Sequence, residues 1–211
     1  MRMLWIAMAS LLGGLASAQA QPGRSAGMSD RDIQMRLEMG QELEASTRGD
    51  LNGDRAADTA FVASSPDARF VHTMLGGQVA RQAGILKLEP NPHRPARLRI
   101  TNGVLAVEDE SGGTVAMAAT YRYRLDPRAG RMRLIGLDAR LFYRTFENDG
   151  FEMSWNLVTG DLVTRVLRPA RRGGRQTYEP AFEQHSKRSS RAVYMEQTPD
   201  PEMVMIDIRR R

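Results

Sequence analysis

The chain has 211 residues, a formal net charge of +5 and no cysteine. That length fits one domain able to bury its own core. The lack of cysteine excludes disulfides, a thiol nucleophile and a lipid anchor built on cysteine.

The first twenty residues have the pattern of a secretory signal peptide. Arg2 precedes an apolar run from Met3 to Ala16, and small residues follow at Ala18 and Ala20. We therefore predict a signal peptide over 1–20, a Gly/Pro/Ser-rich linker over 21–28 and a single β-rich domain over 29–211. The predicted location is periplasmic or secreted.

Export limits the partners of this basic chain. An exported protein meets little nucleic acid, so an anionic envelope polymer or a lipid surface is favoured as the partner of the arginines. After the signal peptide, no stretch reaches the roughly 20 apolar residues that a membrane-spanning helix needs. We therefore predict no nucleic-acid partner and no transmembrane helix after signal removal.

The mature chain is predicted to begin with a helix of about four turns over residues 29–46. Ser29 followed by Asp32 has the shape of a capping box, and Ile33, Leu37 and Leu43 recur on one helical face.

After this helix the apolar period changes to two. The predicted strands are short runs rich in β-branched and aromatic residues, separated by turn residues. They cover 58–64, 68–75, 85–88, 98–109, 114–126, 130–147 and 150–167. The predicted fold class is mainly β (α+β): an N-terminal helix followed by an antiparallel β-meander that forms a sheet or a partly closed barrel or sandwich.

One hairpin is specific enough to predict its register. If Asp126 pairs with Arg131 across a four-residue loop, Tyr123 faces Leu134 on one side of the sheet. The opposite side then collects Arg122, Arg124, Arg131 and Arg133. Such a ladder is either a solvated outer face relieved by nearby acids or a site for an anionic ligand.

The C-terminal part is predicted to lie at the surface. Residues 168–190 are basic and interrupted by Pro and Gly, which favours a surface excursion or mobile arm. The Arg-rich segment from Arg165 to Arg191 is a candidate for attachment to anionic lipid or polysaccharide. Residues 201–208 are predicted to return as an edge strand.

The stretch from Arg48 to Ser64, RGDLNGDRAADTAFVAS, contains the candidate metal site. Counting Asp50 as position one, side-chain oxygens stand at positions one, three, five and nine, and position seven offers a backbone carbonyl. The candidate ligands are Asp50, Asn52, Asp54, the carbonyl of Ala56, and Asp58. Ca²⁺ prefers six to eight oxygens, and alternate residues of a tight loop can present several to one point. The metal-free alternative is a series of Asx-turns.

The spacing separates two families of calcium loop. An EF-hand needs a bidentate Glu at position twelve, which here is Phe61, and a helix after the loop. The stretch instead resembles the calcium loop of FG-GAP or VCBS-type repeats, D-x-N/D-x-D-G-x-x-D before an apolar strand. This resemblance implies a structural Ca²⁺ that orders the junction between the predicted helix and the strand. Arg55 departs from the family, which usually has Gly there.

A second resemblance covers about Leu98 to Val166. The segments GRMRLIGLDA and SWNLVTG are similar to uncharacterised exported bacterial proteins that carry one such loop and then a β-meander. This resemblance implies no activity.

Catalytic motifs are scarce in the sequence. No G-x-S-x-G elbow, zinc motif or phosphate-binding Gly-rich loop occurs. We therefore interpret the chain as a non-enzymatic, envelope-associated binding module. The alternative is an envelope hydrolase with a site assembled around His72 from acids distant in the sequence.

Overall fold

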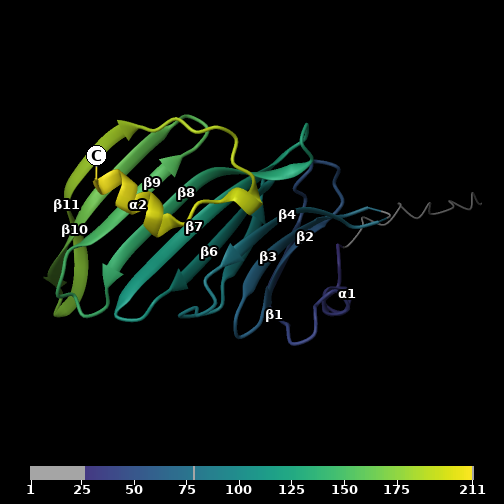
Figure 1. Ribbon diagram of the computed structural model, residues 1–211, viewed down its shortest axis with the longest axis horizontal. Helices are drawn as coiled ribbons and strands as arrows, with labels where there is room; N and C mark the ends of the chain where they lie inside the picture. The colour runs from purple at the N-terminus through teal and green to yellow at the C-terminus, as the bar shows by residue number, and fades with distance from the viewer. Residues whose placement is uncertain (1–26, 78, 211) are drawn as a thin grey trace, which may run out of the picture.

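The computed structural model describes residues 27–77 and 79–210 (Figure 1). The predicted signal peptide and most of the predicted linker lie outside the described residues. Two antiparallel sheets, one of four strands and one of seven, form most of this part of the chain, and neither closes into a barrel. The predicted mainly β fold class is confirmed. Within the described ranges, no helix has the length and apolar character needed to cross a membrane.

The four-stranded sheet follows chain order. It consists of β1 (Glu42–Gly49), β2 (Asp58–Ser64), β3 (Arg69–Leu75) and β4 (Arg81–Leu88). The strand β2 is buried on both faces along most of its length, because the other sheet covers one face and the N-terminal segment covers the other.

The seven-stranded sheet is a meander in which each strand pairs with the next along the chain. Its strands are β5 (Arg97–Thr101), β6 (Val104–Ser111), β7 (Val115–Asp126), β8 (Arg131–Tyr143), β9 (Gly150–Asn156), β10 (Asp161–Arg172) and β11 (Arg175–Lys187).

The two sheets meet along one edge and pack over a common core. Strands β1 and β5 lie in contact, and a Cβ on Gly49 would come within 2.7 Å of Ile100, so glycine permits this approach. On the other side, β4 contacts the short 3₁₀ helix η1 (Met195–Gln197) and β8. The core joins buried residues of both sheets, among them Val62, Val71, Leu105, Tyr123, Leu134 and Met153.

The prediction of a long N-terminal helix is wrong. The helix α1 covers only Asp30–Gln34, and β1 begins at Glu42. The predicted capping box is confirmed, since the Ser29 amide donates to Asp32 Oδ2 at 2.9 Å and the Asp32 amide donates to Ser29 Oγ at 3.2 Å. Gly40, with φ +84°, stands in the turn that precedes β1.

The reason for this difference lies in packing. Leu37 and Leu43 contact a cluster built on Ile33, Phe61 and Met74, which covers the outer face of the four-stranded sheet. The apolar positions of the sequence are therefore core positions, as their pattern indicated. The second half of the segment meets the cluster as a strand paired with β2 rather than as a helix, since tertiary pairing overrides local propensity.

The predicted C-terminal edge strand is also wrong, because Pro201–Arg209 forms the helix α2. Asp200 caps it, accepting from the Glu202 amide at 2.7 Å, and Pro201 occupies its first turn. Val204 and Met205 are buried against the seven-stranded sheet, which α2 crosses (Figure 1). A capping residue followed by Pro was the helix signal in this sequence.

The predicted hairpin register is confirmed: Asp126 pairs with Arg131, and Tyr123 with Leu134. On the opposite face Arg122 binds Asp138 at 2.6 Å, and Arg131 binds Glu196 at 2.7 Å. Nearby acids thus relieve part of the arginine ladder.

The basic segment 168–190 lies mostly within a regular hairpin rather than an irregular arm. Gly173 and Gly174, both with positive φ, form its turn. Strand β10 pairs with β9 only as far as Leu167, so the hairpin continues beyond the sheet with two strands alone. Most of β11 is exposed, which agrees with the predicted surface position.

Candidate functional site

The candidate metal loop connects two strands of the four-stranded sheet. Strand β1 ends at Gly49, β2 begins at Asp58, and these two residues are register partners. The expected strand after the loop is confirmed, whereas the expected helix before it is wrong. A metal in this loop would order a β-hairpin.

The side chains of the loop bind its own backbone. Asp50 accepts from the Gly53 amide at 2.6 Å and from the Arg55 amide at 2.9 Å. Asn52 Oδ1 accepts from the Asp54 amide at 2.9 Å, and Asp54 Oδ1 accepts from the Ala56 amide at 2.7 Å. These successive Asx-turns hold the loop in a tight curve.

Asp58 is the most buried of the four candidate side chains, with an exposed fraction of 0%. Its carboxylate accepts from the Leu51 amide and from the Gly76 amide, both at 2.7 Å. Burial raises the pKa of Asp58, the two amides oppose this, and the charges of Asp54 and Asp50 raise it further. Asp58 therefore fastens the loop to the end of β3 under electrostatic strain.

Two residues of the loop have left-handed backbone conformations, Gly53 with φ +82° and Arg55 with φ +69°. Arg55 occupies the position where the FG-GAP pattern has Gly. A left-handed conformation costs a residue with a Cβ about 1 kcal/mol more than it costs Gly. Arg55 is consequently a strained residue at this position.

The carboxylates of the loop have no ion-pair partner among the described residues, although the loop itself contains Arg55. Within residues 27–77 and 79–210, Asp50, Asp54 and Asp58 form no ion pair, and the neighbouring Arg48 binds Asp30 at 2.6 Å instead. Across these same ranges, no three His, Cys, Asp or Glu side chains are grouped as a metal centre would require. The sequence therefore located a compact acidic loop, in which each carboxylate faces amide donors.

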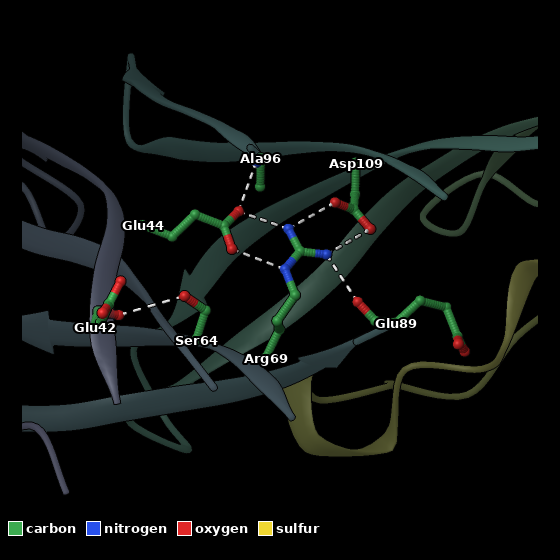
Figure 2. A network of polar contacts seen from close by, with 7 residues as sticks. All are labelled: Glu42, Glu44, Ser64, Arg69, Glu89, Ala96 and Asp109. Atoms are coloured by element: carbon green, nitrogen blue, oxygen red, sulfur yellow. Dashed lines mark hydrogen bonds and ion pairs between the residues drawn. The ribbon is translucent and has the colours of Figure 1, made fainter. Parts of the chain in front are cut away.

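A second buried acidic cluster, shown in Figure 2, does contain a cation. Arg69 of β3 has an exposed fraction of 1%, and its guanidinium binds Glu44 of β1 at 2.6 Å and Asp109 of β6 at 3.1 Å. Arg69 Nη1 also donates to the Glu89 carbonyl at 2.8 Å, and the Ala96 amide donates to Glu44 at 2.7 Å. This Arg69 network joins the two sheets.

The two carboxylates of the Arg69 network differ in pKa. Burial opposes the charge of Glu44, but the hydrogen bonds from Arg69 and from the Ala96 amide lower its pKa. Burial dominates at Asp109 and raises its pKa, while Arg69 offsets only part of that effect. Sequence reasoning missed this network because its members are distant in the chain; its only local signal is a charged residue at the start of the apolar run 69–75.

His72 lies in β3 beneath an apolar cover. Its ring stacks on Phe61 with centroids 5.0 Å apart, and burial lowers its pKa, while Gln82 and Glu38 act in the opposite direction. A cavity of about 450 Å³ adjoins it, and Glu38 is the one carboxylate that lines this space. The hydrolase alternative requires His72 together with acids of the meander, and this cavity does not bring them together.

This chain matches no protein-family model, no curated protein and no solved structure. The sequence indicated the loop 50–58, the surroundings of His72 and the Arg-rich segment 165–191, whereas the Arg69 network is assembled only by the fold.

Proposed function

We propose that this chain is an exported, non-enzymatic β-rich binding module whose loop 50–58 takes up a structural Ca²⁺ ion. The observation that supports the ion is the concentration of three carboxylates within nine residues, none of which forms an ion pair in the described part of the chain although Arg55 lies in the same loop. Like charges this close repel one another, and a bound cation removes that repulsion.

The proposed ligands are Asp50, Asn52, Asp54, the carbonyl of Ala56, and Asp58. A carboxylate oxygen has more than one acceptor direction, so an oxygen that accepts from an amide can also ligate a cation. The Asx-turns keep the loop curved, which lowers the ordering entropy that binding requires. We further propose that the loop is a single FG-GAP/VCBS-like motif.

The role of this ion is structural. Asp58 connects the loop to the end of β3 through the Gly76 amide, so a cation at the loop would strengthen the attachment of β1 and β2 to β3. Affinity in the weak extracellular range, with a dissociation constant of about 10⁻⁴ to 10⁻³ M, suffices for an exported protein.

The proposed partner of the module is an anionic envelope polymer or lipid surface, contacted by the β10–β11 hairpin. Beyond Leu167 this hairpin projects as two strands. It carries four arginines that form no ion pair among the described residues, Arg168, Arg171, Arg172 and Arg175. Projecting, uncompensated arginines are suited to phosphate and carboxylate groups on a surface.

The calcium proposal is tested by thermal unfolding of the mature chain. Calcium at about 10 mM should stabilise it by about 1.4–2.7 kcal/mol, which raises Tm by about 3–10 °C, and chelator should reverse the shift. Asp54→Asn keeps an oxygen acceptor for the Ala56 amide but removes a charge, so it should abolish the response. Glu147→Gln, at an exposed acid outside the loop, is the matched control.

The partner proposal is tested by sedimentation with vesicles that contain an anionic phospholipid. Binding should fall steeply between low and high salt, and replacing Arg171, Arg172 and Arg175 by Gln should remove it. Binding that is indifferent to salt would exclude this role of the hairpin.

A further inference from the structure

A cavity of about 620 Å³ lies between the two sheets, at the end of β4 and beside the segment that leads into α2. Most of its lining comes from the end of β4, from β6, β7 and β8, and from residues 198–202. Small-molecule sites in proteins commonly have volumes of about 300–1,000 Å³. The cavity is therefore large enough to enclose most of a small organic molecule.

The floor of this cavity is apolar. Residues of β4, β7 and β8 form it, namely Leu86, Leu88, Met117, Ala119, Tyr121 and Leu141. Leu86 and Leu88 are nearly fully buried, so the floor is a continuation of the core rather than a surface patch. Such a floor is suited to a hydrocarbon or aromatic group.

The rim of the cavity is acidic although the whole chain is basic. Five carboxylates line the cavity, Asp67, Glu89, Asp109, Asp200 and Glu202, against one cationic side chain, Lys87. Arg69 partly neutralises Asp109 from beneath. The other four acids form no ion pair within residues 27–77 and 79–210, which leaves negative charge concentrated around one opening.

Tyr121 points to a ligand independently of the acids. It is 8% exposed, lines the cavity, and its hydroxyl forms no hydrogen bond within the described part of the chain. The hydroxyl oxygen remains accessible from the cavity, so a ligand there can bind it in place of water. Burial raises the pKa of Tyr121, and the charges of Asp109, Asp200 and Glu89, which line the same cavity, raise it further.

We propose that this cavity binds a small organic cation, an amine or quaternary ammonium group joined to an apolar body. The apolar body lies on the leucine floor, and the cationic group lies among Glu89, Asp200 and the Tyr121 hydroxyl. The tyrosine ring adds the attraction of a cation to an aromatic face. This inference rests on the proposal that the chain is a binding module, and is independent of calcium in the loop.

The negative charge of the rim favours a cationic ligand over a neutral or an anionic one. An anionic ligand would have to approach four acids that have no ion-pair partner, and a neutral ligand would leave them unneutralised. Among small molecules with the same apolar body, affinity should therefore follow the charge of the head group, with the cation first and the anion last.

The test compares phenylbutylamine, phenylbutanol and phenylbutyrate, which share one apolar body and differ in head group. Isothermal calorimetry on the mature chain should show the amine binding about fivefold or more tightly than the alcohol, with no binding of the carboxylate. Salt at about 0.5 M should weaken binding of the amine and leave the affinity for the alcohol unchanged. Amide shifts of residues 86–88 and 117–121 in NMR spectra should place the amine in the cavity.

Matched variants separate the site from the fold. Glu89→Gln combined with Glu202→Gln changes two exposed rim acids and should weaken the amine about fivefold or more, while the alcohol is unaffected. Tyr121→Phe should weaken both the amine and the alcohol. Glu147→Gln, at an acid that does not line the cavity, should change nothing.

Two results would overturn the proposal. If the alcohol or the carboxylate binds as well as the amine, the cation class is wrong while the binding-module proposal stands. If none of the three binds at millimolar concentration to a chain that unfolds cooperatively, the cavity is not a ligand site. Neither result bears on the calcium response, which is measured separately.

Discussion

The Arg69 network and the loop 50–58 each contain a carboxylate that is almost fully buried, Asp109 and Asp58, but only Asp109 is paired with a cation. At Arg69, a guanidinium that is 1% exposed serves Glu44 and Asp109. In the loop, Asp58 is 0% exposed and accepts only from backbone amides. Burial raises the pKa of both Asp109 and Asp58, so the two carboxyls face the same electrostatic problem.

This difference supports the proposal that an external cation binds at the loop. Where the fold joins its two sheets, it supplies the positive charge from its own chain, and the connection needs nothing else. In the turn between β1 and β2, the buried Asp58 accepts from backbone amides, and among the described residues no cationic side chain pairs with it. We propose, as the central claim, that Ca²⁺ supplies in the loop the positive charge that Arg69 supplies between the sheets.

The largest expected effect comes from removing the internal cation. Arg69→Met leaves Glu44 and Asp109 buried without a cationic partner, which should lower the free energy of unfolding by about 3–5 kcal/mol. Urea unfolding at neutral pH measures it. Arg122→Met is the matched control: Arg122 binds Asp138 where both side chains are about two-fifths exposed, so its loss should be below about 1 kcal/mol. Equal losses in the two variants would remove the distinction on which the comparison rests.

The next effect is the pH dependence of that loss. A carboxyl whose folded-state pKa lies above its unfolded value stabilises the fold at low pH, and this contribution disappears as pH rises through the folded value. Arg69 lowers the pKa of both Asp109 and Glu44, so both pKa values should rise when Arg69 is removed. The deficit of Arg69→Met should therefore be greatest near pH 7 and shrink toward about pH 4. A deficit that is constant with pH would mean that lost packing, not charge, causes it.

The loop should show the corresponding competition with protons. Because the pKa of Asp58 is raised, protonation removes a charge from the loop at a higher pH than in an unfolded chain. A protonated carboxyl does not ligate calcium. The increase of Tm with calcium should therefore fall as the pH is lowered from about 7 to about 4, and thermal scans at three pH values with and without chelator measure it. A constant increase would place the ion elsewhere.

The smallest effect concerns backbone strain at Arg55, which has φ +69°. Arg55→Gly should raise the calcium-free stability by about 0.5–1 kcal/mol, because glycine adopts this conformation without the Cβ penalty. Arg55→Ala removes the same charge but keeps the Cβ, so it should leave the strain in place. If alanine stabilises as much as glycine, the charge of Arg55 and not its backbone limits the loop.

Most strands could be predicted from the sequence because apolar and polar residues alternate along a half-buried antiparallel strand. The hairpin from Tyr123 to Leu134 was predicted to the residue, since its loop length fixes its register. The prediction of a long N-terminal helix was wrong for a physical reason. Ile33, Leu37 and Leu43 have helical spacing in the sequence and pack in one cluster, but Leu43 reaches that cluster from the strand β1.

The candidate sites divide in the same way. The loop 50–58 was found because its oxygens are neighbours in the chain, and its place before a strand was correct. The Arg69 network and the cavity at Tyr121 were not found, since their residues come from different strands and meet only after the sheets pack. The spacing of residues along a sequence does not show which distant residues come into contact in the folded chain.

The most direct test of the central claim is the number of calcium ions bound per chain. Equilibrium dialysis of the mature protein against millimolar calcium should give one ion per chain for the wild type, and none at the same concentration for Asp54→Asn. The account would be contradicted if the wild type bound no calcium at about 10 mM, or if Asp54→Asn bound it equally well.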